Sequence, residues 1–324
     1  VQGRHPLQCN DALGAAASQI GPQAHAAFAL LNKRAGLSHG KVAAVMRDMF
    51  GISVSRGEVA GSLLGTAWKC RLAELEIREA VRSALVVAAD ETGWRVAGLL
   101  AWLHVLTTAR ATWYKVADTR GSETARAVLG REWNGTLVHA GWSPYDKIPA
   151  GAHQQCLAHI MRRCHEISET AGGAAAEFSG RVQELFKTSL EIRDSLTAGE
   201  PPAGESVRLA QALTEQLKLL ATGHFKNPVK RRLAKHLLSH LNAWFVFLRK
   251  PDVPATSNSA ERALRPAVVN RKVWGGNRTR AGAIAQGILC SVITTCGQIK
   301  RNAMEFLTSL LTSREPLPLF VSGP

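Results

Sequence analysis

Several common features are absent from this sequence of 324 residues. No apolar run reaches the roughly 18 to 20 residues that a membrane span requires, and the N-terminus has no secretory pattern. The six cysteines form no Cys-x-x-Cys pair, which argues against a zinc ribbon or a disulfide framework, so we expect reduced thiols. Internal repeats and low-complexity tracts are also lacking. Because the first residue is Val1 rather than Met, we expect a fragment of a longer protein.

Acidic residues are scarce relative to basic ones. The chain has 25 Asp and Glu against 40 Lys and Arg, which gives a formal net charge of +15. Such a charge predicts a negatively charged partner, which is nucleic acid, anionic lipid or an acidic protein. Because no membrane span is found, we expect no membrane partner and favour a cytoplasmic nucleic-acid-binding protein. The length permits at least one sizeable core and two or three domains.

The spacing of apolar residues divides the chain into four predicted regions. Residues 1–82 are predicted to be helical, and within them residues 39–69 have the pattern of two helices joined by a tight turn at Gly51, Ile52 and Ser53. Val42, Val45, Met46 and Phe50 repeat at helical spacing, Ser55 is a plausible N-cap, and Val59, Leu63 and Leu64 continue on the next helix. This pattern resembles a DNA-reading helix-turn-helix, and an ordinary helical hairpin is the alternative.

The remaining three regions are predicted to be 83–169, 170–250 and 251–324. The first of them contains predicted strands at 84–92, 99–108, 111–118 and 135–140, a helix at 121–130 and a long helix from near Gln155. Three strands, a helix, a strand and a helix is the order of an RNase H-like mixed α/β core. We predict an all-helical insertion at 170–250, broken by a linker at 197–206 and a basic loop at 223–236. The final region is predicted to end the core, with a basic loop and a last helix pair.

Two carboxylates stand at positions that suit metal chemistry. Asp90 ends the first predicted strand, where a carboxylate needs a metal, a base or a hydrogen bond, although a turn or N-cap role is the alternative. Glu261 lies in the first turn of a predicted helix that Ser257 or Asn258 caps, and a capping-box role is its alternative.

Three segments carry a resemblance to a known family. They are ADETGWRV at 89–96, CLAHIMRRC at 156–164 and NSAERALRPAVVNRKVWGGNR at 258–278. In this order they closely resemble the transposases of the insertion-sequence-66 family of bacteria, and the likeness runs from residues 1–8 through the final helices. The resemblance implies a DDE-type enzyme, in which two aspartates and a glutamate on an RNase H-like sheet hold two Mg²⁺ or Mn²⁺ ions about 3.5 to 4 Å apart.

The resemblance also implies a function and partners. A transposase of this type binds the terminal repeats of its own element, cuts 3′ ends with metal-activated water and joins them to target DNA. The implied partners are double-stranded DNA, a second copy or larger assembly, and accessory proteins of the same element, at the bacterial nucleoid.

One expected ligand is missing from the motif set. Asp90 matches the first aspartate of the family and Glu261 its glutamate, but Ala140 stands where the second aspartate belongs. The flanking residues are intact, so a single substitution, either engineered or from natural decay, accounts for the difference. We expect neither His139 nor Asp146 to replace the missing carboxylate. The chain is therefore predicted to bind DNA with little or no strand cleavage.

Other residues are candidates for supporting roles. Cys156 and His159 stand one helical turn apart, as in some metal sites, but no second pair stands at zinc spacing. The resemblance points instead to a supporting role for His159, either in contact with the scissile phosphate or in orienting water. Phosphate contacts are predicted for Arg162 and Arg163, with a solvated helix face as the alternative, and for the loop around Gly275 and Gly276 through Arg271, Lys272, Arg278 and Arg280. Trp94, Trp142 and Trp274 are candidates to stack on unpaired bases, and core packing is the alternative for each.

Two rival functions stay open at this point. The chain is alternatively a DNA-binding regulator or domesticated remnant without catalysis, although such a protein has no need to keep Glu261. The other alternative is an RNase H-like nuclease that acts on RNA–DNA hybrids or junctions, which the long helical insertion makes less favourable.

Overall fold

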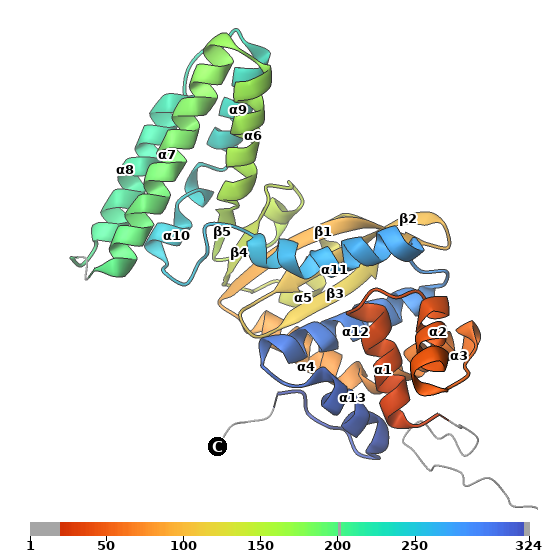
Figure 1. Cartoon of the computed structure of the whole chain (residues 1–324). Helices are drawn as coiled ribbons and strands as arrows, with labels where there is room; N and C mark the ends of the chain where they lie inside the picture. The colour runs from red at the N-terminus through yellow and green to blue at the C-terminus, as the bar shows by residue number, and fades with distance from the viewer. Residues whose placement is uncertain (1–19, 200–201, 321–324) are drawn as a thin grey trace, which may run out of the picture. The chain divides into compact units, whose positions relative to one another are not determined.

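The computed structural model describes residues 20–199 and 202–320 of the chain (Figure 1). The chain forms two compact units. The described residues of the first are 20–84, 90–130 and 260–320, and those of the second are 85–89, 131–199 and 202–259. Part of the predicted region 1–82 and of the family likeness at residues 1–8 lies outside the described residues.

The first unit is mainly helical around three strands. Its elements are α1 (Pro22–Lys33), α2 (His39–Phe50), α3 (Arg56–Lys69), α4 (Arg71–Arg82), most of β1 (Val86–Val96), β2 (Leu99–Thr107), β3 (Thr112–Ala117), α5 (Glu123–Leu129), α11 (Asn258–Trp274), α12 (Arg280–Gln298) and α13 (Ala303–Thr312). The second unit contains β4 (Thr136–His139), β5 (Ala152–Gln155), α6 (Leu157–Thr170), α7 (Gly173–Ala198), α8 (Glu205–Ala221), α9 (Pro228–Ser239), α10 (Val246–Arg249) and two short 3-10 turns, Tyr145–Lys147 and Leu241–Ala243.

A five-stranded mixed sheet has the order β3-β2-β1-β4-β5. β2 and β3 pair antiparallel, while β1 pairs parallel with β4, and β4 pairs parallel with β5. The predicted mixed α/β fold and its four strands are confirmed. The short strand β5 was not predicted, because Ala152–Gln155 has neither β-branched residues nor alternation.

Helix α12 covers the outer edge of β3. Gly287, Ser291 and Thr295 stand four residues apart on one face of this helix. The hydroxyls of Ser291 and Thr295 accept the backbone N–H groups of Tyr114 (2.8 Å) and Thr112 (3.1 Å). A side chain at Gly287 would lie 2.8 Å from the Tyr114 carbonyl, so only glycine permits this approach. The helix thereby supplies hydrogen-bond acceptors to backbone N–H groups of the edge strand β3 that would otherwise be unpaired.

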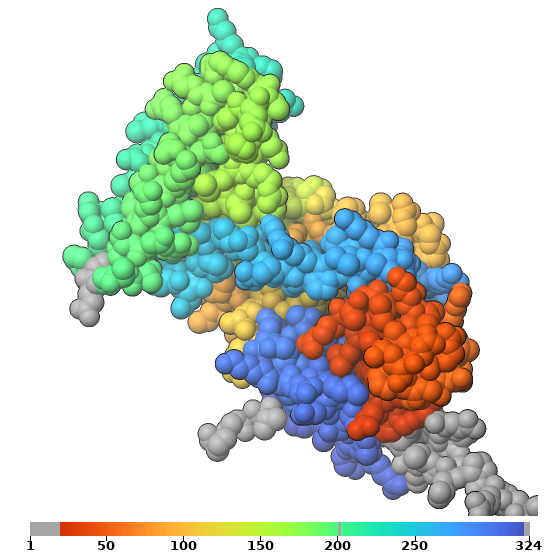
Figure 2. All heavy atoms as spheres, in the orientation of Figure 1, coloured from red at the N-terminus to blue at the C-terminus, as the bar shows by residue number. Residues whose placement is uncertain are grey.

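The predicted helix pair near the N-terminus is present as α2 and α3 (Figure 1), and their atoms are among the orange spheres of Figure 2. Gly51 ends α2 in the left-handed conformation, and Ser55 and Glu58 form a capping box at the start of α3. The expected apolar face is only partly correct, because Phe50 and Leu64 are exposed while Val42, Met46, Val59 and Leu63 are buried. A helix-turn-helix role in reading DNA stays a prediction.

The helical segment of the second unit has an aromatic core. Phe186 on α7 packs against Trp244 and Phe245, with ring centroids 5.3 and 5.7 Å away. The amide of Gln154 on β5 donates to the Trp244 carbonyl and accepts from the Phe247 N–H, which fastens the strand to α10. None of the described helices is both long and apolar enough to span a lipid bilayer.

The predicted basic loop at 223–236 is wrong in its second half, which is helix α9. Asn227 caps this helix by accepting the N–H groups of Val229 (2.9 Å) and Lys230 (3.1 Å), and Pro228 occupies its first turn. Leu233 and Leu237 are buried one turn apart. The Asn-Pro start and this spacing were the signals in the sequence, and the density of charge obscured them.

Candidate active site and nucleic-acid interface

Asp90 lies within β1 rather than at its end, which corrects the sequence expectation. The strand continues to Val96 because Ala97 and Asn277 extend its hydrogen bonding, with the Asn277 N–H donating to Arg95 (2.9 Å). One Asp90 oxygen accepts the N–H of Glu91 at 2.9 Å. Asp90 is half-buried, whereas the Glu91 carboxylate is buried and paired with Arg120 at 2.7 Å. Glu91 therefore serves an ion pair, and Asp90 is the more accessible of the two acids.

Ala140 follows the last residue of β4 in the second unit. It is half-buried, and Gly141 after it has a positive φ of 80°. A side chain at Gly141 would meet the Gln155 amide oxygen at 2.9 Å and the His236 ring at 3.3 Å. A side chain at position 141 would therefore be both strained and crowded, and the methyl group of Ala140 offers no ligand atom.

Cys156 and His159 lie at the start of α6, where Cys156 is the N-cap. The Ser257 N–H donates to the Cys156 sulfur at 3.2 Å, and the Leu157 N–H donates to Ala255 at 2.9 Å. Burial raises the pKa of the Cys156 thiol, but hydrogen bonds from His159 and Ser257 lower it by more, so the net pKa lies below its usual value. These bonds join the start of α6 to the segment that leads into α11.

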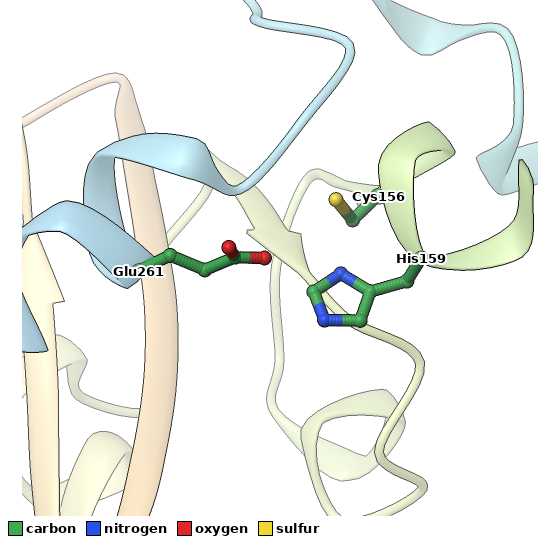
Figure 3. Close-up of side chains that lie close together, drawn as sticks. All are labelled: Cys156, His159 and Glu261. Carbon is green, nitrogen blue, oxygen red and sulfur yellow. The ribbon is translucent and has the colours of Figure 1, made fainter. Parts of the chain in front are cut away.

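Glu261 occupies the first turn of α11 and is half-buried. Figure 3 draws its side chain with those of Cys156 and His159, which are a carboxylate, a thiol and an imidazole, all common metal-ligand types. Glu261 belongs to the first unit and the other two to the second, so no common site is assigned to them.

The predicted basic loop around Gly275 is shorter than expected, because α11 extends to Trp274 and α12 begins at Arg280. Arg271 donates to the Gly93 carbonyl and to the Thr92 hydroxyl. Arg280 pairs with both oxygens of Asp118, at 2.6 and 2.7 Å. Lys272 and Arg278 are exposed and have no hydrogen bond or ion pair within the described segments. These two are the cations of the predicted set that are available to a phosphate.

The fold itself requires glycine at position 276 of this loop. Gly276 has a φ of 126°, and a side chain there would lie 2.4 Å from the Arg95 carbonyl. The close approach that glycine permits is thus to β1 of the same chain. A phosphate role for the loop stays a prediction.

The three candidate tryptophans differ in surroundings. Trp94 is buried, donates to the Asn277 side chain at 2.7 Å and packs edge-to-face on Trp274 at 5.8 Å. The Lys33 ammonium lies 5.6 Å from the Trp274 ring. The packing alternative therefore holds for Trp94, and base stacking by Trp274 would compete with these contacts. Trp142 is 36% exposed, so its ring remains a candidate for a base.

A histidine cluster near position 140 was missed from the sequence. The His139 and His153 rings are joined at 3.1 Å, and His240 lies 3.0 Å from an Asp146 oxygen. Burial, then the charges of His153 and His240, lower the pKa of His139 to about 3. Asp146, His153 and His240 line a cavity of about 890 Å³. Their sequence separations of 7 to 94 residues obey no motif spacing, so only the fold reveals the cluster.

Comparison with known proteins places these features in a class. A family model for transposases matches residues 17–285, which include positions 90, 140, 156, 159 and 261. The chain belongs to the family described as Transposase IS66, and the predicted membership is confirmed.

Two relatives come from Sinorhizobium fredii, and both are named only as uncharacterized proteins. The protein y4hP is 24% identical over 214 residues, which are 57% of this chain and 37% of y4hP. The protein y4jO is 32% identical over 60 residues, which are 18% of this chain and 19% of y4jO. The matched parts thus span well under half the length of either relative.

Proposed function

We propose that the chain is the catalytic region of a DDE-type DNA transposase with an RNase H-like core. Its function would be to bind the terminal repeats of an element, cut the DNA strands and join them to target DNA as a dimer or larger assembly. The observation that carries the proposal is the match to a transposase family over residues 17–285. The strand order β3-β2-β1-β4-β5, with parallel β1, β4 and β5, supports the RNase H-like assignment.

The strand register supports position 140 as the missing ligand position. Ala88 of β1 pairs with Val138 of β4 in parallel register. Asp90 and Ala140 each follow these residues by two positions, and side chains two apart along an extended strand share a face. If the backbone stays extended one residue past β4, a carboxylate at 140 would point to the same face of that strand as the Val138 side chain.

The retained acids suit the implied cation but form an incomplete set. Asp90 and Glu261 would hold Mg²⁺ or Mn²⁺, which prefer carboxylate oxygens. When bound, two such ions lower the pKa of water and stabilise charge on the reacting phosphate oxygens. Ala140 supplies no oxygen, so we expect this chain to bind DNA and to cleave little of it. His159, Arg162 and Arg163 would contact the phosphate, together with Lys272 and Arg278.

The test is a cleavage assay on labelled duplexes that tile the ends of the encoding element, with Mg²⁺ or Mn²⁺. We expect this chain to be nearly inactive and Ala140→Asp to cut at the element ends. Ala140→Asn is the matched control, because asparagine has nearly the size of aspartate but no charge, and this variant should stay inactive. Adding Glu261→Gln to Ala140→Asp should abolish the restored cutting. Robust cutting by the unaltered chain would show that position 140 is not part of the site.

The alternative is a DNA-binding regulator without catalysis. It predicts that Ala140→Asp binds the element ends as tightly as this chain but cuts none of them. The codon at position 140 in the natural gene is a second discriminator, because an Asp codon there means that the alanine was introduced.

A further inference from the structure

We propose that the exposed side of α9 binds the phosphate backbone of duplex DNA. The basic face of α9 is defined by Arg231, Arg232 and Lys235, all of which are exposed. The inference rests on the proposed function and adds a DNA-contacting helix in the second unit that lies outside the three family motifs.

The three cations of the basic face have no hydrogen-bonded or ion-paired partner among the described residues, unlike four of the five Lys and Arg on α7 and α8, where Arg181 is the exception. On α7 and α8, Lys187, Arg193, Arg208 and Lys218 pair with Glu184, Asp194, Glu205 and Glu215 at 2.6 to 3.4 Å. Across the described segments, no hydrogen bond or ion pair involves the side chains of the basic face. From residue 216 to residue 251 the sequence has eight Lys and Arg and no Asp or Glu. A positive surface without counter-charges of its own is a site for an external anion.

The helix also fixes the direction of these charges. Leu233, Ala234 and Leu237 are buried, and Arg231 and Lys235 project from the opposite side of the helix. Arg231 and Lys235 are one turn apart, about 6 Å along the axis. A capped helix thus presents its charges as an ordered row, which suits a regular series of phosphates better than mobile loop cations would.

Neighbouring groups add to the positive potential. Burial, then the charges of His240 and Arg163, lower the pKa of His236 to about 4, while Asp146 acts in the opposite direction. Arg163 on α6 therefore lies near enough to α9 to act on it electrostatically. The phosphate contact predicted for Arg163 and the basic face would belong to one surface.

The apolar side of α9 argues against a membrane surface as the anion. An interfacial helix buries an apolar face in lipid. In α9 that face already packs in the protein, because Leu233 and Leu237 are fully buried. Duplex DNA needs only the cations, since phosphate contacts supply most of the non-specific affinity.

The test compares two triple variants of the full chain in binding to a 30-base-pair duplex of arbitrary sequence. One variant carries Arg231→Gln, Arg232→Gln and Lys235→Gln, and the matched control carries Lys187→Gln, Arg193→Gln and Arg208→Gln, which removes the same charge from paired cations. Affinity is measured between 50 and 300 mM salt. Each lost phosphate contact reduces the slope of log affinity against log salt by about 0.9, so the basic-face variant should lose about 2 to 3 units. The control should keep the slope of the unaltered chain.

Each outcome has a definite meaning. An unchanged slope in the basic-face variant, or an equal loss in the control, overturns the inference while the proposed function stands. Failure of the unaltered chain to bind duplex DNA overturns both. Vesicles with phosphatidylserine and a poly-aspartate competitor serve as further probes. If the basic-face variant loses either of these interactions but not DNA binding, the surface belongs to that other anion. Circular dichroism checks that both variants fold.

Discussion

Lys33 carries an ammonium group in the core of the first unit. It is 5% exposed, donates to the side-chain amide oxygen of Gln286 at 2.7 Å and lies against the ring of Trp274. Burial lowers the pKa of Lys33 to about 8, although the nearby Cys290 sulfur acts in the opposite direction. A buried cation with a single hydrogen-bonded partner makes the stability of the fold depend on pH.

The direction of that dependence follows from the two states. In the unfolded chain the pKa of Lys33 returns to about 10.5, so between pH 8 and 10.5 the unfolded state holds a proton that the folded state lacks. The contribution of Lys33 to stability should therefore rise with pH in this window, by up to about 1.4 kcal/mol per pH unit, and its penalty should be fully present below pH 8. Urea unfolding of the chain and of Lys33→Met, with reductant present, measures this. The variant should lose this slope, the exposed Lys41→Met should keep it, and equal slopes in all three proteins would refute the assignment.

Single residues were predicted well where a local motif fixes them and poorly where a distant partner does. Asp90 and Glu261 stand in continuous motifs, so their candidacy needed no structure. Arg271 was expected at a phosphate, but the Gly93 carbonyl that it contacts lies 178 residues earlier in the sequence. The clash that would exclude a side chain at Gly276 likewise comes from Arg95 on another element. The sequence shows the chemical type of such a residue, but it does not show which group the residue contacts in the folded chain.

At the scale of elements, α9 depends on its cap. The Asn227 side chain satisfies two N–H groups of the first turn, in a helix whose exposed side is rich in like charges. Asn227→Ala should lower the free energy of unfolding by about 1 kcal/mol, because the cap is lost. Asn227→Ser should lower it by much less, because serine can also cap a helix. Hydrogen exchange of the first turn of α9 and urea unfolding provide the measurement. If the first turn of α9 were equally protected from exchange in Asn227→Ala and Asn227→Ser, Pro228 and packing alone would define the start of the helix.

Elements with a strong apolar period were the ones that the sequence predicted. The runs that became β1 to β4 are rich in β-branched and aromatic residues, and their positions agree with the prediction to within a few residues, apart from the longer β1. The strand β5 has no such run, and it exists because β4 offers a parallel neighbour. The close fit of α12 on β3 uses small residues at spacing four, a pattern that resembles ordinary helix sequence until the partner is known.

At the scale of the whole molecule, the first unit is assembled from three separate segments of chain. Helix α12 comes from the last segment, yet it contacts α1, α3, α4 and β3 from the first two. Folding of this unit must therefore wait for contacts of long sequence separation. The helices α7 to α9 pack among themselves within a single segment.

This organisation predicts that a destabilising substitution in the core of one unit lowers the stability of that unit and not of the other. Leu289 of α12 and Leu217 of α8 are both fully buried leucines, which makes them a matched pair. Substitution of either by alanine should cost about 2 to 5 kcal/mol locally. Hydrogen exchange with mass spectrometry should show that Leu289→Ala reduces protection in α1, α3 and α4 but not in α7 to α9. Leu217→Ala should have the reverse pattern, because α8 packs against α7, α9 and α10. Equal loss across the chain in both variants would mean that the two units unfold as one.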